Sequence, residues 1–415
     1  MALKLLSVLG LVVFVALAWA CSVDRRRFPW RTVLSGVALQ FLFALLILQT
    51  PWGRAFFDGF QSAITRLLGF AAEGSSFVFG PLANEAAIQK GLGTPSGFVF
   101  VITVSGTIIL VSALSSFLYH YGILQVIVRG VAWVMERVMK TSGSESLAAA
   151  ANIFMGQTEA PLVIKPYLPH MTRSEIMALM TGGMATIAGG VLAAYVGFGV
   201  SAGHLLTASV MSAPAALLIA KIMLPETETS ETAAGARAKI ERETHNGLDA
   251  LCRGASDGAY LSLNVMAMLI AFVAVVALAN FLVASGLEFV GIQNAAPLQT
   301  LFGWLNYPFA WLIGVPQKDC FAVGQILGER IVLNEFIGYL SLAKVKADLD
   351  PRSVTLVTYA LCGFANFSSI AIQIGGIGSL APSRRADLAK LGLRAMVAGL
   401  LACYMTAAIA GIILN

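Results

Sequence analysis

Two groups of hydrogen-bonding side chains interrupt strongly apolar parts of this sequence. The first group is Gln157, Thr158 and Glu159, and the second is Asn334 and Glu335. A carboxylate in apolar surroundings is costly, so such a group is a functional candidate by default. Carboxylates and amides accept or donate hydrogen bonds to the polar groups of a solute. We therefore start from Glu159 and Glu335 as candidate parts of a binding site.

Enzymatic chemistry has little support in the sequence. There is no HExxH motif, and no spacing pairs a serine with a histidine as nucleophile and base. The cysteines have no CxxC spacing and none is close to a histidine, which argues against a zinc site or a disulfide framework. We expect no catalytic residue, and we interpret all five cysteines as packing residues: Cys21, Cys252, Cys320, Cys362 and Cys403.

The composition indicates a membrane protein. Of 415 residues, 58% are hydrophobic and 12% are charged, against roughly 25% charged residues in an average soluble domain. This excludes an ordinary soluble protein, a disordered chain and a nucleic-acid binder. We attribute the net charge of +5 to loops that face the cytoplasm, and not to a nucleic-acid partner.

Stretches without charged residues are long enough to cross a bilayer, which needs about 20 apolar residues. The stretch 176–220 is long enough for two spans, and the glycines between 197 and 203 mark the turn between them. The sequence therefore predicts an all-α polytopic membrane protein with eight transmembrane helices, near 4–23, 32–50, 97–120, 174–197, 202–223, 258–285, 353–379 and 394–414.

Basic residues predict the orientation of these spans. Clusters at 25–31, 221–253 and 384–394 fall on one side, which the positive-inside rule makes cytoplasmic, so both termini lie outside. The expected location is a bacterial inner membrane. Lys344, Lys346 and Arg352 would then lie outside, against the rule.

Four further segments have their own interpretations. The start of the chain resembles a lipoprotein signal cleaved at Cys21, but the many later spans favour a retained first helix. Residues 121–140 predict an amphipathic helix, either interfacial or packed against the protein. Residues 51–90 are interpreted as an external segment with an interfacial helix, and residues 225–250 as a solvated cytoplasmic loop.

Two regions fit neither one crossing nor a loop. Residues 145–170 and 298–343 are apolar with a polar centre, as expected for re-entrant hairpins that enter from opposite sides, although two full spans remain an alternative for the second. A glycine-rich helix with buried polar residues follows each of them. Such inverted repeats are typical of secondary transporters, whose sites form where hairpin tips and interrupted helices meet.

Several of these features also have a purely structural interpretation. Single Gly, Ser and Thr residues in membrane helices are more often packing devices than ligands. Glu329 and Arg330 are interpreted as a structural ion pair. The histidines are expected at interfaces or in loops, and they are His120, His170, His204 and His245.

The hairpins and the seventh span together resemble the concentrative nucleoside transporter family in its bacterial eight-span form. The matching strings are GQTEAPLVIKPYL at 156–168, VLNEFIGY at 332–339 and CGFANFSSIAIQIGGIG at 362–378. The resemblance implies a homotrimer in the lipid bilayer and an elevator mechanism, in which a transport domain carries the solute past a fixed scaffold. It divides the chain into scaffold (1–120 and 258–290), transport domain (121–223 and 291–415) and a cytoplasmic linker (224–257).

The resemblance also implies a nucleoside site and a sodium site. Gln157, Thr158 and Glu159 would face the nucleobase, between Val191 and Phe364 as apolar walls. The residues implied for the ribose are Glu335, Asn366 and Ser369. The sodium ligands would be the side chains of Asn152 and Thr186 and the backbone carbonyls of Met155 and Ile187.

The expected function is sodium-coupled symport of a nucleoside such as uridine, with no cofactor besides the coupling ion. The alternatives are a proton-coupled nucleoside symporter and, further away, an ion-coupled carrier of another small polar solute. An anionic substrate would favour Arg at a tip, where this chain has Glu. A channel is disfavoured because single carboxylates in hairpins do not form a ring of pore charges.

Overall fold

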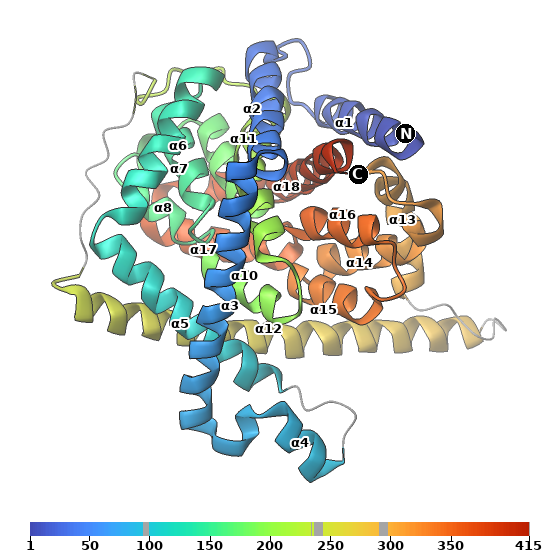
Figure 1. The fold of residues 1–415 in the computed structure, drawn as a ribbon. Coiled ribbons are helices and arrows are strands. Elements are labelled where there is room, and N and C mark those ends of the chain that lie inside the picture. The colour runs from blue at the N-terminus through green and yellow to red at the C-terminus, as the bar shows by residue number, and fades with distance from the viewer. Residues whose placement is uncertain (94–98, 234, 236–243, 290–297, 415) are drawn as a thin grey trace.

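The computed structural model describes residues 1–93, 99–233, 235, 244–289 and 298–414, and every regular element among them is a helix (Figure 1). Short helices and 3-10 turns join the longer ones. The long continuous helices are α1 (Ala2–Ala20), α2 (Trp30–Gln49), α3 (Pro51–Phe79), α5 (Phe100–His120), α6 (Ile123–Met139), α11 (Ala202–Met223), α12 (Gly247–Phe289) and α18 (Arg385–Ile413).

Among the described residues, seven helical stretches are long and apolar enough to cross a membrane. They correspond to the expected spans except the one near 353–379. That span consists of α16 (Pro351–Leu361) and α17 (Phe367–Leu380), which the segment 362–366 separates. The polypeptide is thus an all-helical, multi-pass membrane protein, as the charge-free stretches predict.

The first hairpin begins with α7 (Gly143–Asn152), whose first turn is closed by a capping box between Ser142 and Glu145. The chain then turns through the tip. Its returning limb is irregular and contains only α8 (Ala160–Val163) and the 3-10 turn η2 (Leu168–His170).

The second hairpin is shorter than the expected range 298–343. That range holds a separate helix, α13 (Leu298–Leu312), then η3 (Gln317–Asp319), α14 (Cys320–Val332) and α15 (Glu335–Val345). The left-handed Gly314 and the following Pro316 end α13 and turn the chain before the hairpin. The hairpin itself is α14 and α15, and its tip is Leu333 and Asn334.

Each hairpin is followed by an interrupted helix and then a continuous one, so the inverted repeat is confirmed. After the first come α9 (Arg173–Ala185), α10 (Gly189–Gly197) and α11. After the second come α16, α17 and α18, the last two joined by the 3-10 turn η4 (Pro382–Arg384). The breaks fall at 186–188 and 362–366.

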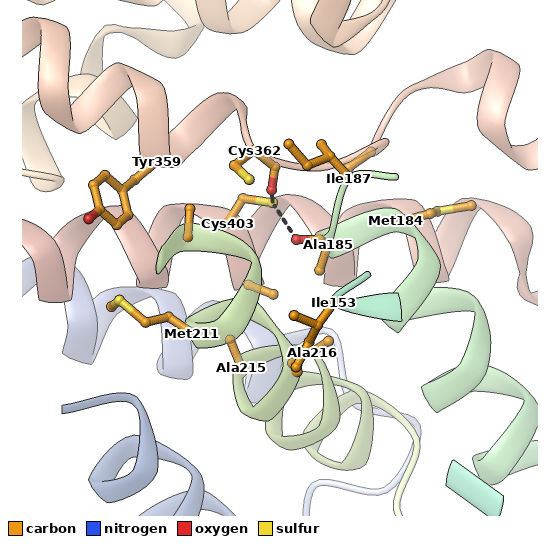
Figure 2. Packing of buried hydrophobic residues seen from close by; sticks show 14 of the residues in the cluster. Ile153, Met184, Ala185, Ile187, Met211, Ala215, Ala216, Tyr359, Cys362 and Cys403 are labelled. Atoms are coloured by element: carbon orange, nitrogen blue, oxygen red, sulfur yellow. Dashed lines mark hydrogen bonds between the residues drawn. The ribbon is translucent and has the colours of Figure 1, made fainter. Parts of the chain in front are cut away.

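The two helix breaks meet on α18 (Figure 2). The thiol of Cys403 lies 3.4 Å from the carbonyl oxygen of Cys362 and 3.7 Å from that of Ala185, so it is shared between the ends of α16 and α9. A Cβ on Gly363 would lie 2.7 Å from the carbonyl oxygen of Met184. Close approach of the two interrupted helices therefore requires glycine at position 363.

Helix α12 begins at Gly247, well before the expected start near residue 258, and so takes up part of the segment expected as linker. It packs along α5 and runs lengthwise across the lower part of the view in Figure 1. Helix α3 is also longer than expected for an interfacial helix, and it contacts α2, α5 and α11. Short helices follow it, η1 (Gly80–Ala83) and α4 (Glu85–Leu92), which project from the body in Figure 1.

The expected ion pair between Glu329 and Arg330 does not form. The fully buried guanidinium of Arg330 instead donates to the carbonyl oxygens of Ala360 and Gly363 and contacts the sulfur of Cys403. Neighbouring residues on a helix point in different directions, so adjacency in the sequence does not make them partners. Arg330 thus satisfies carbonyls that the break in the seventh span leaves open.

Two other expectations need correction. The loop 225–250 is not solvated throughout: Thr232 is buried and donates to the carboxylate of Glu175 at the start of α9. The cysteines divide into a buried group (Cys320, Cys362 and Cys403) and an exposed pair. The exposed Cys21 and Cys252 are therefore not packing residues in this chain.

Arg352 and Lys346, which the positive-inside rule leaves unexplained, bind backbone carbonyls. Arg352 donates to Gly314, Gly411 and Leu414, and so satisfies the C-terminal carbonyls of α18. Lys346 donates to the carbonyl oxygen of Gly199 after α10. Basic side chains stabilise helix C-termini in this way, which gives these residues a local structural role.

Candidate functional site

The tips of both hairpins and the start of α17 lie together in the structure. Glu335 is the first residue of α15, and its position is fixed by Asn334, whose side chain caps that helix. Asn366 caps α17 in the same way and accepts from the backbone N–H of Ser369. The helix breaks therefore expose backbone ends that polar side chains satisfy, and these side chains line the site.

A chain of hydrogen bonds joins the residues expected to bind nucleobase and ribose. The side-chain amide of Gln157 donates to the hydroxyl of Ser369 at 3.2 Å. The amide of Asn366 donates to one carboxylate oxygen of Glu335 at 2.9 Å. All four of these side chains are buried. The structure thus brings together Gln157 from the first hairpin, Glu335 from the second, and Asn366 and Ser369 at the start of α17.

Two residues of this network were not singled out from the sequence. Tyr195 on α10 donates from its hydroxyl to the second carboxylate oxygen of Glu335 at 2.9 Å. Gln373 on α17 donates to the side-chain carbonyl of Gln157 at 3.0 Å. Helical spacing could have found both, because each follows an expected site residue, Val191 or Ser369, by four positions on the same helical face.

Thr158 and Glu159 lie differently from Gln157, because their side chains are exposed. One carboxylate oxygen of Glu159 accepts from the backbone N–H of Gly156 at 3.3 Å. Val191 is buried and Phe364 is half-buried. The carbonyl oxygen of Phe364 accepts from the backbone N–H of Asn366 at 2.9 Å, which places Phe364 directly beside the hydrogen-bonded chain.

Glu159 faces a cavity of about 490 Å³ between the first hairpin, the start of α10, α5 and α12. This volume lies within the range of small-molecule sites. The charged and aromatic side chains that line it are Glu159, Lys165, Arg253, Asp257, Tyr119, His120 and Phe154.

The four expected sodium ligands lie at two helix ends that are side by side: Asn152 ends α7 and Met155 follows it, and Thr186 and Ile187 follow α9. The backbone N–H of Gly189 donates to the carbonyl oxygen of Phe154, which ties the turn after α7 to the turn after α9. A Cβ on Gly182 would lie 3.2 Å from the amide nitrogen of Asn152, and the hydroxyl of Thr186 donates to the carbonyl of Gly182. The side chains of Asn152 and Thr186 thus both lie next to the backbone of Gly182, and so lie close to each other.

The oxygens at this place are suited to a hard cation. The side-chain oxygen of Asn152 is buried and has no hydrogen-bond partner among the described residues. The hydroxyl of Thr186 uses its proton on Gly182, so its lone pairs remain available. Within the described chain, no main-chain hydrogen bond reaches the carbonyl oxygens of Met155 and Ile187. Uncharged oxygen donors of this kind fit sodium.

Comparison with known proteins agrees with this geometry. Residues 204–411 match the family model "Na+ dependent nucleoside transporter C-terminus", residues 9–82 match its N-terminal counterpart, and residues 101–202 match a "Gate" model described as nucleoside recognition. The chain is 44% identical over 415 residues to an uncharacterized transporter of Haemophilus influenzae, covering 99% of this chain and 97% of that one.

Two further similarities extend over almost the whole chain. The nucleoside permease NupC of Helicobacter pylori is 40% identical over 418 residues, covering 99% of this chain and 98% of that protein. A structure of CNTnw in an inward-facing substrate-bound state is similar with a TM-score of 0.92 and 38% identity, covering 99% of this chain and 97% of that one. The chain therefore belongs to the sodium-dependent nucleoside transporter family.

Proposed function

We propose that this protein is a sodium-coupled concentrative nucleoside symporter of a bacterial inner membrane, with uridine as a representative substrate. The observation that carries the proposal is the hydrogen-bonded chain from Gln157 through Ser369 and Asn366 to Glu335, which joins the two hairpin tips. Its groups are uncharged or acidic, which suits a neutral solute with several hydroxyls.

The two ends of the chain suit the two halves of a nucleoside. Glu335, Asn366 and Ser369 offer acceptors and donors to ribose hydroxyls, and Gln157, Thr158 and Glu159 offer them to the edge of a base, beside Val191 and Phe364. A site built to bind hydroxyls is left with unpaired polar groups by a free base, so we expect free bases to be rejected.

Transport would proceed by an elevator in a homotrimer. The proposed mobile part contains both hairpins and the interrupted helices that pack on α18, within 121–223 and 291–415. The proposed scaffold contains α5 and α12, which pack along each other, and the remaining residues of 1–120. The cavity beside Glu159 lies between these two parts, which supports its role in the path of the solute.

The coupling ion would be held by the side chains of Asn152 and Thr186 and the carbonyls of Met155 and Ile187.

We expect Thr186→Val to raise the sodium concentration for half-maximal uptake about tenfold, equivalent to about 1.4 kcal/mol, because it removes one ligand oxygen and keeps the shape of the side chain. Thr186→Ser keeps the hydroxyl and is the matched control. Sodium titrations of uridine uptake test this, and equal sodium dependence in both variants would contradict the assignment.

The function itself is tested in membrane vesicles that contain the purified protein. Uridine is expected to accumulate under an inward sodium gradient and not under an inward proton gradient alone. Accumulation driven by protons would establish the proton-coupled alternative, and uptake indifferent to both gradients would exclude symport. Competition by other nucleosides, deoxynucleosides and free bases in the same assay then defines which groups of the solute are recognised.

A further inference from the structure

Tyr195 contacts the expected ribose subsite through a hydrogen bond to Glu335. It lies on α10, in the first repeat, whereas its partner Glu335 lies at the tip of the second hairpin, 140 positions away. Its side chain is fully buried, and its hydroxyl donates to the carboxylate at 2.9 Å. The ribose subsite is thus completed by a residue of the other repeat.

Among the described residues, two side-chain donors hold the carboxylate of Glu335, one on each oxygen. Tyr195 donates to one oxygen and Asn366 donates to the other, each at 2.9 Å. A carboxylate has about four acceptor positions. The two donors therefore fix the plane of the group, and the remaining acceptor positions point in fixed directions.

The ring of Tyr195 is itself held in place. Its centroid lies 4.3 Å from that of Tyr339 and 5.2 Å from that of Phe336, both on α15. Both neighbouring rings are buried. Because the ring is packed in this way, the position of its hydroxyl is fixed. The hydroxyl therefore holds the carboxylate of Glu335 in one orientation.

We propose that Tyr195 is a positioning residue that determines specificity for ribose: its hydroxyl orients the carboxylate of Glu335 so that the free acceptor positions meet the sugar hydroxyls. This inference rests on the proposed nucleoside function. It assigns to Tyr195 no contact with the substrate, since its effect passes through Glu335. Loss of the hydroxyl should therefore weaken discrimination between ribose and deoxyribose, in addition to affinity.

The test compares Tyr195→Phe with Tyr339→Phe. Both tyrosines are fully buried and lie side by side, but the hydroxyl of Tyr339 donates to the backbone carbonyl of Thr358 and not to Glu335. Each variant loses one buried hydroxyl with the ring kept. Dissociation constants for uridine, 2′-deoxyuridine and 3′-deoxyuridine are measured with purified protein in saturating sodium.

We expect Tyr195→Phe to weaken uridine binding about tenfold, with a smaller loss for at least one deoxynucleoside, so that the preference for ribose falls. Tyr339→Phe should keep the wild-type preference. A wild-type ratio of dissociation constants in Tyr195→Phe, or the same reduced ratio in both variants, would overturn the inference. The ratio is independent of the fraction of folded protein, and absence of nucleoside binding by the wild type would overturn the proposed function instead.

Discussion

Replacement of Glu335 by Gln is expected to abolish nucleoside uptake and to leave the protein folded. The carboxylate accepts from the hydroxyl of Tyr195 and from the amide of Asn366. In Gln, an NH₂ group replaces one of these oxygens and faces a donor. Hydrogen bonds to a charged group contribute about 1.5–3 kcal/mol each. The variant loses such bonds both to its protein partners and to the sugar hydroxyls, so we expect the rate of uridine uptake to fall about a hundredfold or more.

The measurement is sodium-driven uridine uptake, with size-exclusion chromatography to verify the oligomeric state of the variant. Glu329→Gln is the matched control, because Glu329 lies on the same hairpin, and in the described part of the chain the side chains bonded to Glu335 are those of Tyr195 and Asn366 and not that of Glu329. It should keep most of the uptake. Wild-type uptake by Glu335→Gln would show that the ribose assignment is wrong.

The sequence predicts the positions of the main features well because each depends on local residue types. Asn366 follows the Gly363 break and caps the next helix, so the interruption of the seventh span is encoded within a few positions. Glu335 stands out because an acidic residue in an apolar hairpin has no local partner. Both signals are short-range. The structure confirms the interrupted helix, and it places Glu335 directly after the tip of a second hairpin that is shorter than the expected range 298–343.

The sequence could not predict which distant groups become partners. Arg330 is next to Glu329 in the chain, yet it binds the carbonyls of Ala360 and Gly363 across the fold. Helical spacing from Val191 places Tyr195 on the face of the site, but its partner Glu335 is known only once the second hairpin is placed beside α10. Thr232 is in a polar segment typical of a solvated loop, but it is buried and its hydroxyl donates to the buried carboxylate of Glu175.

A buried ionic cluster also connects the first repeat to the linker, again through residues that are far apart in the sequence. The ammonium of Lys221, near the end of α11, lies 2.8 Å from a carboxylate oxygen of Glu145 and 3.2 Å from one of Glu226. It also donates to the hydroxyl of Ser174 at 2.9 Å. The hairpin, α9, α11 and the start of the linker are thus joined through one buried cation.

Lys221→Met is expected to destabilise the protein strongly. Methionine fills a similar volume but leaves Glu145, which is buried at the start of the first hairpin, without its positive partner. Breaking a buried pair in this way costs about 3–5 kcal/mol. Glu226 is less affected because it is partly exposed and water can solvate it. The free energy of unfolding in detergent, from denaturant titration, measures the loss.

The double variant Lys221→Met/Glu145→Gln distinguishes an unpaired charge from lost packing. If the cost comes from the isolated carboxylate, neutralising Glu145 should recover a large part of the stability, because replacing both partners of a buried pair is far less costly than removing one. Lys346→Met is the control for loss of an exposed lysine, whose one hydrogen bond within the described residues goes to the carbonyl oxygen of Gly199. A double variant no more stable than Lys221→Met would mean that the lysine acts through its packing and its bond to Ser174, and not through Glu145.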